Sequence, residues 1–173
     1  MPRFVAMPHE GSREEARFCL RCGAPLVVEE RAGRARPLCR AAGCGFVHWG
    51  NPTPVVAAVV EHDDGVVLVR AKGWPERLFG LVTGFLEADE SPEEGVLREV
   101  REELGLHGRV ASLIGVYAFP QRNELLVAFH VRASGVVELG EELIGHRLIP
   151  PDKLRPWPFG TGLAVRDWLA RRM

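Results

Sequence analysis

The stretch Gly84-Phe-Leu-Glu-Ala-Asp-Glu90-Ser-Pro-Glu-Glu-Gly-Val-Leu-Arg98-Glu99-Val-Arg-Glu102-Glu103-Leu-Gly105-Leu106 decides the fold of this 173-residue chain. Ser91 is a favourable helix N-cap, and the proline after it suits the first helical position. Glu94 follows Ser91 by three residues, as a capping box requires. Gly105 can adopt the left-handed conformation that ends many helices. The stretch therefore predicts a helix over residues 92–104.

The acidic side chains of this helix gather on one face. The helical period places Glu99, Glu102 and Glu103 beside an apolar stripe that packs inward. One interpretation is a solvated surface with ion pairs, because Glu94, Arg98 and Glu102 follow each other at i, i+4 spacing. However, Glu99 and Glu103 form a like-charge pair at that spacing, and Mg²⁺ prefers converging carboxylate oxygens. The pattern favours a metal-binding face.

The same stretch resembles the Nudix box, which reads Gly, five residues, Glu, seven residues, Arg-Glu, an aliphatic residue, any residue, Glu-Glu, any residue, Gly and an aliphatic residue. Every position is filled, by Gly84, Glu90, Arg98, Glu99, Val100, Glu102, Glu103, Gly105 and Leu106. The resemblance implies a Nudix hydrolase that cleaves a nucleoside diphosphate linked to another moiety. It also implies that Glu99, Glu102 and Glu103 hold Mg²⁺ or Mn²⁺, and that Arg98 and Glu90 orient this face by pairing.

Two further groups of the site follow from the same resemblance. The backbone carbonyl of Thr83 is expected to be an extra metal ligand. Glu142 corresponds to the position where relatives place an additional acidic ligand or base, although it can equally be an exposed loop glutamate. The general base of the hydrolysis is therefore either Glu103 or a carboxylate outside the box.

Two close cysteine pairs, at residues 19–22 and 39–44, precede the box, and we interpret them as a zinc ribbon. A zinc ribbon before a Nudix domain, together with the phrase Thr-Gly-Phe-Leu-Glu at residues 83–87, resembles the NADH pyrophosphatase group. The signature of that group after the box is Ser-Gln-Pro-Trp-Pro-Phe-Pro-x-Ser. Residues 115–123 keep only an aromatic-proline pair of it, Phe119-Pro120. Tyr117 and Phe119 are candidates to stack on a base or nicotinamide, or else they fill core or surface. Arg122 either contacts phosphate or is solvated.

All four cysteines of the chain, Cys19, Cys22, Cys39 and Cys44, stand in two close pairs. The first residues lack the apolar core of a signal peptide, so we expect a cytoplasmic protein with reduced thiols. Free or disulfide-linked cysteines are the alternative. Four paired cysteines favour a tetrahedral zinc site, which is structural because no coordination position stays open. Residues 19–50 are then a zinc ribbon, with small strands around residues 26–28 and 46–47.

The rest of the chain predicts an α/β domain over residues 51–173, with a mixed sheet between helices as in the Nudix α/β/α sandwich. The polar lead over residues 1–18 is left undecided between a short helix at residues 11–15 and disorder. Alternating and β-branched runs, turn signals and a final apolar stripe predict the other elements. These are strands at 55–61, 66–69, 79–85, 110–119 and 124–133, a helical turn at 151–154, and a closing helix at 161–172.

Composition limits the possible partners. A net charge of −1 makes nucleic acid an unlikely partner, and no apolar run reaches membrane-spanning length. The expected partner is a small-molecule nucleotide of the ADP-ribose, NADH or FAD type, and relatives suggest a homodimer. The alternative function is a regulator that senses nucleotides without cutting them, with a ribbon that contacts nucleic acid or a protein. Sequence spacing does not identify the substrate.

Overall fold

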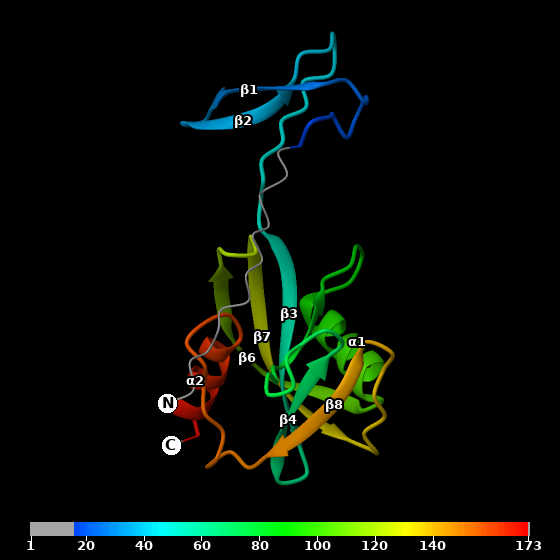
Figure 1. Ribbon diagram of the computed structural model, residues 1–173, viewed down its shortest axis with the longest axis vertical. Helices are drawn as coiled ribbons and strands as arrows, with labels where there is room; N and C mark the ends of the chain where they lie inside the picture. Colours follow the sequence, from blue (N-terminus) through cyan, green and yellow to red (C-terminus); the bar gives the residue numbers. More distant parts are fainter. Residues whose placement is uncertain (1–15, 173) are drawn as a thin grey trace. The chain divides into compact units, whose positions relative to one another are not determined.

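The computed structural model describes residues 16–172, in two compact units divided between Asn51 and Pro52 (Figure 1). We call Met1–Asn51 the ribbon unit and Pro52–Met173 the sheet unit. The predicted choice for residues 11–15, a short helix or disorder, lies outside the described residues. Each unit is described by itself below.

The ribbon unit contains one antiparallel hairpin, formed by β1 (Leu26–Arg31) and β2 (Arg34–Cys39). Its two-residue turn, Ala32-Gly33, has positive φ at both positions, 51° and 72°, as hairpin turns of type I′ require. The strand predicted at residues 26–28 is confirmed. The pair Phe46-Val47 does not form a second strand, because Val47 makes only an isolated bridge to Leu38 of β2.

The sheet unit is built on a mixed six-stranded sheet with strand order β6-β7-β3-β4-β8, and β5 pairs with β3 beside this path. The pair β3·β7 is parallel, and the other pairs are antiparallel. The elements are β3 (Thr53–His62), β4 (Gly65–Ala71), β5 (Val82–Phe85), α1 (Pro92–Leu104), β6 (His107–Phe119), β7 (Glu124–Ser134), β8 (Leu143–Ile149) and α2 (Gly162–Ala170).

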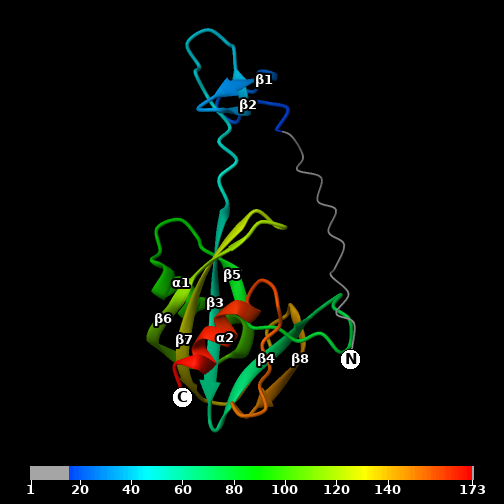
Figure 2. The same ribbon diagram turned by 90° about the vertical axis from the view of Figure 1, so that its left-hand side faces the viewer.

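The two helices pack on opposite faces of this sheet (Figure 2). The central strand β3 is buried on both faces, and its side chains alternate between two cores. On one face Val56, Ala58 and Val60 pack with α1 residues, and on the other Ala57 and Val59 pack with α2 residues. The predicted fold class, an α/β sandwich with a mixed sheet between helices, is confirmed.

Helix α1 has the predicted bounds because its caps form as the sequence dictates. The backbone N–H of Glu94 donates to Ser91 Oγ at 3.3 Å, and the N–H of Ser91 donates to Glu94 Oε2 at 2.8 Å. Gly105 closes the helix with φ 67°. Both ends are thus fixed by local bonds, which sets the direction in which the acidic face points.

Two other predicted elements differ from the structure in their bounds. The strand expected at residues 79–85 begins only at Val82, and Gly80 before it makes a single bridge to Val69. The closing helix spans Gly162–Ala170 rather than residues 161–172. The turn predicted at residues 151–154 forms, because the N–H groups of Lys153 and Leu154 both donate to the carbonyl of Pro150. Strand β8 was not predicted, because it is an edge strand with mostly exposed residues, and its sequence lacks a clear alternation of apolar and polar residues. Between residues 16 and 172, no helix combines the length and apolarity needed to cross a membrane.

Candidate active site

Arg98 ties the loop before α1 to the acidic face of the helix. Its Nε and Nη2 donate to the two oxygens of Glu90 at 3.0 and 2.8 Å, and Nη1 donates to Glu99 Oε1 and Glu102 Oε2 at 2.6 and 3.1 Å. A further Nη2 bond of 3.0 Å reaches the carbonyl of Phe85. These contacts occupy all five N–H donors of the guanidinium. Arg98 therefore orients the carboxylates and has no N–H left to donate to a ligand.

The pKa values around Arg98 follow from these bonds. The guanidinium, with the backbone N–H of Glu87, lowers the pKa of Glu90 to about 2. Burial raises the pKa of Glu99, and the nearby charges of Glu102 and Glu142 add to this effect while Arg98 opposes it. Glu90 is therefore a fixed anion, whereas Glu99 lies in an environment that disfavours its charge.

Gly84 leaves the space that the carboxylate of Glu99 occupies. A Cβ atom at position 84 would lie 1.9 Å from Glu99 Cδ and Oε1, much closer than any non-bonded contact allows. Gly84 lies in β5 next to Thr83, and both residues line the same cavity as Glu99. The glycine of the sequence motif is thus required for close approach of helix and strand.

Glu103 carries a buried oxygen that lacks a donor. Its Oε2 atom has no hydrogen-bond partner among residues 16–172. Burial and the charges of Glu99 and Glu142 raise the pKa of Glu103 to about 8. A buried carboxylate oxygen without a donor is costly unless a cation binds it. The donor set of carboxylate and carbonyl oxygens fits a hard divalent cation such as Mg²⁺ or Mn²⁺.

One cavity of about 550 Å³ brings most of the predicted site residues together. It spans β5, α1, the turn before β7 and the segment before β8. The predicted residues that line it are Thr83, Arg98, Glu99, Glu102, Glu103, Arg122 and Glu142. The sequence predicts either an acidic ligand or base or an exposed loop glutamate at position 142. In the structure Glu142 lines the same cavity as the carboxylates of α1.

Tyr117 and Phe119, which were candidates for stacking, do not line this cavity. Tyr117 packs with the core under α2 and donates its hydroxyl to Asp167 Oδ2 at 2.9 Å. Burial and this carboxylate raise the pKa of Tyr117 to about 12. Phe119 lies next to Gly160, in the segment that precedes α2. The alternating strand pattern put both rings on one face, but it did not say which face.

Two cavity residues were missed by sequence reasoning. Phe85 is 59% exposed, an unusual exposure for an aromatic ring, and it lines the cavity next to Gly84. Glu124 is 8% exposed and pairs with Arg122 through a 3.0 Å bond from Nε to Oε1. A charged residue at the start of a predicted strand was the only available signal for Glu124.

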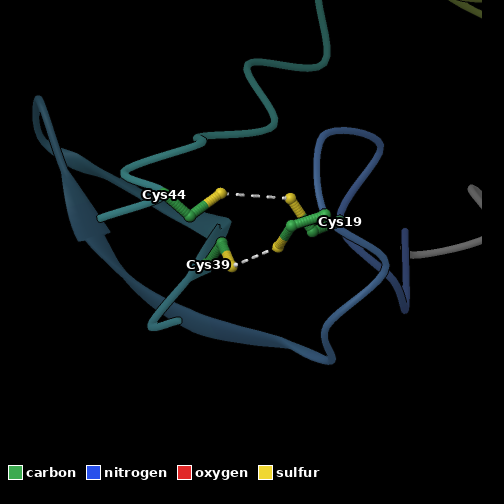
Figure 3. Close-up of side chains that lie close together, drawn as sticks. Cys19, Cys39 and Cys44 are labelled. Atoms are coloured by element: carbon green, nitrogen blue, oxygen red, sulfur yellow. Dashed lines mark hydrogen bonds between the residues drawn. The ribbon is translucent and has the colours of Figure 1, made fainter. Parts of the chain in front are cut away.

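The four cysteines of the ribbon unit form a separate site (Figure 3). Their sulfur atoms all lie within 4.8 Å of one another, and the pairs Cys19–Cys44 and Cys22–Cys39 are 3.6 and 3.5 Å apart. These distances exclude disulfide bonds, which join sulfurs at about 2 Å. They fit four thiolates around one tetrahedral zinc ion, whose Zn–S bonds of about 2.3 Å put the sulfurs somewhat under 4 Å apart.

The chain is similar to proteins of known family. The NUDIX domain model matches residues 51–169. NAD-capped RNA hydrolase NudC of Stutzerimonas stutzeri is 31% identical over 162 residues, which cover 91% of this chain and 57% of the relative. NudC of Mycobacterium bovis is 40% identical over 121 residues, which cover 68% of this chain and 36% of the relative. The chain thus spans about half or less of the length of these relatives.

Solved structures share the fold. A NUDIX hydrolase from Nitrosomonas europaea superposes with a TM-score of 0.76 at 24% identity, covering 90% of this chain and 92% of the other. An ADP-ribose pyrophosphatase from Streptococcus suis gives a TM-score of 0.59 at 20% identity, over 70% of this chain and 92% of the other. Because the family model matches residues 51–169 and the box motif is complete, this chain belongs to the Nudix hydrolases.

Proposed function

We propose that the sheet unit hydrolyses the diphosphate linkage of a nucleoside diphosphate derivative and releases a nucleoside monophosphate. The observation that carries this proposal is the buried, donor-less Oε2 of Glu103 in a cavity lined by six other carboxylates. Such a group destabilises the protein unless a divalent cation binds it. A cation at that position is useful for phosphate chemistry, where negative charge must be neutralised.

Residues of α1 would hold the metal. Glu99, Glu102 and Glu103 would supply carboxylate oxygens, and Thr83, through its carbonyl, and Glu142 would complete the set, since both residues line the same cavity. When bound, Mg²⁺ or Mn²⁺ supplies charge neutralisation of the diphosphate and a bound water of lowered pKa. Arg98 acts through these carboxylates, because all its donors are used to orient them.

The proton of the attacking water must go to a carboxylate of the cavity. A water oxygen attacks one phosphorus atom, the bridging P–O bond breaks, and the two phosphate groups separate as products. Glu103 is one candidate base, because its buried carboxylate lines the cavity beside the other acidic residues. Its pKa of about 8 belongs to the metal-free site, and a bound cation would lower it. Glu142 is the alternative, since its charge is close enough to raise the pKa of Glu103.

The substrate class is supported by the cavity and by the relatives. Phe85 offers an exposed ring on which a base or a nicotinamide can stack. Arg122, which pairs with Glu124, adds a positive charge to the lining of the cavity. The curated relatives are described as NAD-capped RNA hydrolases. We therefore place NAD-type dinucleotides first among the candidates, followed by ADP-ribose and FAD.

The ribbon unit is proposed to bind one structural Zn²⁺ through Cys19, Cys22, Cys39 and Cys44. All four positions of a tetrahedral site would be thiolates, so no position is left for a substrate or a water. Only a small number of apolar side chains are buried around these cysteines. Zinc would therefore supply much of the folding free energy of this unit.

A panel assay tests the proposed function. The full chain is incubated with NADH, NAD, ADP-ribose, FAD and a dinucleoside polyphosphate, each with Mg²⁺ or Mn²⁺, and the products are identified by mass. We expect a nucleoside monophosphate from at least one of them and no product from Glu103→Gln. Full turnover by this variant would contradict the site assignment. Tight nucleotide binding with no cleavage under any condition would instead support the sensor, the alternative function.

A further inference from the structure

The net charge of −1 conceals two oppositely charged units. Residues 1–51 contain eight arginines and five glutamates, a net charge of +3. Residues 52–173 contain fourteen basic and eighteen acidic residues, a net charge of −4. The low total charge was the reason to expect no nucleic-acid partner, and that reason does not hold for the ribbon unit taken by itself.

Strand alternation gathers the arginines of the ribbon unit on one face of its hairpin. Arg31 of β1 is directly opposite Arg34 of β2, and Glu29 is opposite Arg36, so these four residues point to the same side. Arg40 joins them, because its Nε donates to Glu29 Oε1 at 2.6 Å. We call Arg31, Arg34, Arg36, Arg40 and the adjoining Trp49 the arginine face.

Most of the positive charge on this face is uncompensated. Glu29 is its only acidic residue, and Arg40 neutralises it. Arg31 and Arg34 are exposed at the tip of the hairpin and make no ion pair with any residue between 16 and 172. Two free guanidiniums side by side attract phosphate groups, which they can bind with paired hydrogen bonds.

Trp49 adds an aromatic surface to the arginine face. Its ring is 51% exposed, and the guanidinium of Arg36 lies 4.9 Å from the ring centre. Arg36 also donates to the backbone carbonyl of Trp49, which holds the two side chains together. A rigid, half-exposed indole next to arginines is the combination that binds single-stranded nucleic acid, where bases stack and the backbone is neutralised.

The zinc site lies on the other side of the hairpin. Cys39 pairs with Leu26 and therefore points away from the face shared by Arg34 and Arg36. Four thiolates around Zn²⁺ carry a formal charge of about −2, which would weaken phosphate binding if it lay among the arginines. Its position behind β2 leaves the arginine face positive in the metal-loaded protein.

We propose that the arginine face of the ribbon unit binds single-stranded RNA. Arg31 and Arg34 contact phosphates, and Trp49 stacks on one base. This inference goes beyond the hydrolysis proposed above, because RNA without any cleavable cap is expected to bind.

The test measures binding of the zinc-loaded full chain to a labelled, uncapped RNA of about 15 nucleotides by fluorescence anisotropy, from about 50 to 200 mM salt. We expect Arg31→Glu/Arg34→Glu to weaken binding at least tenfold at low salt. The slope of log Kd against log salt should fall by about 1.4, from about 0.7 for each lost phosphate contact. Trp49→Ala should weaken binding at least fivefold, which is about 1 kcal/mol, and leave the slope unchanged.

The matched control is Arg77→Glu/Arg109→Glu, which changes the charge by the same amount at exposed positions of the sheet unit. It should bind RNA within twofold of the wild type. Equal losses in both double variants, or no loss in either, would overturn the inference. The inference would also be overturned if heparin bound as tightly as RNA and Trp49→Ala had no effect on RNA binding.

Two further measurements keep the outcome clear. Zinc content and thermal melting show that the hairpin variant is folded, and if it is not, Arg34→Gln and Trp49→Ala decide the question. Hydrolysis of a small dinucleotide should be the same in all variants, because the arginine face lies outside the catalytic cavity. Failure of RNA binding is thus separate from failure of the proposed hydrolysis.

Discussion

Replacing Glu103 by glutamine should stabilise the metal-free protein while abolishing its activity. The carboxyl of Glu103 is buried, its Oε2 has no donor among the described residues, and its pKa is raised from 4.5 to about 8. The folded state therefore holds a proton that the unfolded chain releases above pH 4.5. The contribution of Glu103 to the stability of the wild type therefore falls as pH rises from 4.5 to about 8, and it levels off above that range.

The size of this effect follows from the two pKa values. Each pH unit between them removes up to about 1.4 kcal/mol, so the upper limit at pH 8 is about 5 kcal/mol. Water reaches an open cavity and local relaxation reduces the penalty of a buried charge, so we expect about 2 kcal/mol. For a unit of this size that corresponds to an increase in Tm of about 5–10 °C for Glu103→Gln at pH 8. At pH 5 the two proteins should melt within about 2 °C of each other.

The assay is urea unfolding and thermal melting, both followed by tryptophan fluorescence, at pH 5 and pH 8, in buffers freed of divalent ions on a chelating resin. Glu102→Gln is the control, because the Glu102 side chain is 59% exposed and its charge is already paired with Arg98. It should gain no stability at pH 8. Added Mg²⁺ should stabilise the wild type and not Glu103→Gln. A variant that is no more stable than the wild type at pH 8, or equally more stable at pH 5, would refute the reasoning.

Three further predictions concern other parts of the chain. Arg98→Lys should lower the free energy of unfolding by about 2 kcal/mol in urea titrations and reduce kcat at least tenfold, because lysine cannot reproduce the paired bonds to Glu90. Wild-type values of both quantities would contradict the role of Arg98. Gly84→Ala should reduce kcat/KM at least tenfold with an unchanged circular dichroism spectrum, since its Cβ would displace the carboxylate of Glu99; unchanged kinetics would exclude that contact. Cys39→Ser should lower bound zinc, measured by atomic absorption, and lower the melting temperature of the ribbon unit; an identical melting curve would count against structural zinc.

The sequence predicted those parts of the molecule that local chemistry decides. Helix α1 has the expected ends because Ser91, Glu94 and Gly105 form their capping contacts within a few residues. The acidic face follows from helical periodicity alone. The hairpin of β3 and β4 was also confirmed, since a two-residue turn of Asp63 and Asp64 connects two strongly apolar strands.

The parts that long-range packing decides were not predictable in this way. Tyr117 could face either layer, and its bond to Asp167 depends on where α2 packs, fifty residues later in the chain. Phe85 and Glu124 meet in one cavity because β5 and β7 both pair with β3, a pairing that no local pattern encodes. Strand β8 forms because it adds an edge to β4, and an edge strand does not need two buried faces.

The opposite charges of the two units address one physical problem of such an enzyme. A diphosphate is an anion, yet the proposed site consists of carboxylates within a unit of net charge −4. Arg98 cannot attract the substrate, because all its donors are used, and Arg122 is paired with Glu124. Bound metal ions at the cavity would therefore supply attraction for a small anion, and the arginine face would attract a longer polyanion. Without divalent metal, a small nucleotide should then bind weakly, whereas RNA should still bind to the arginine face.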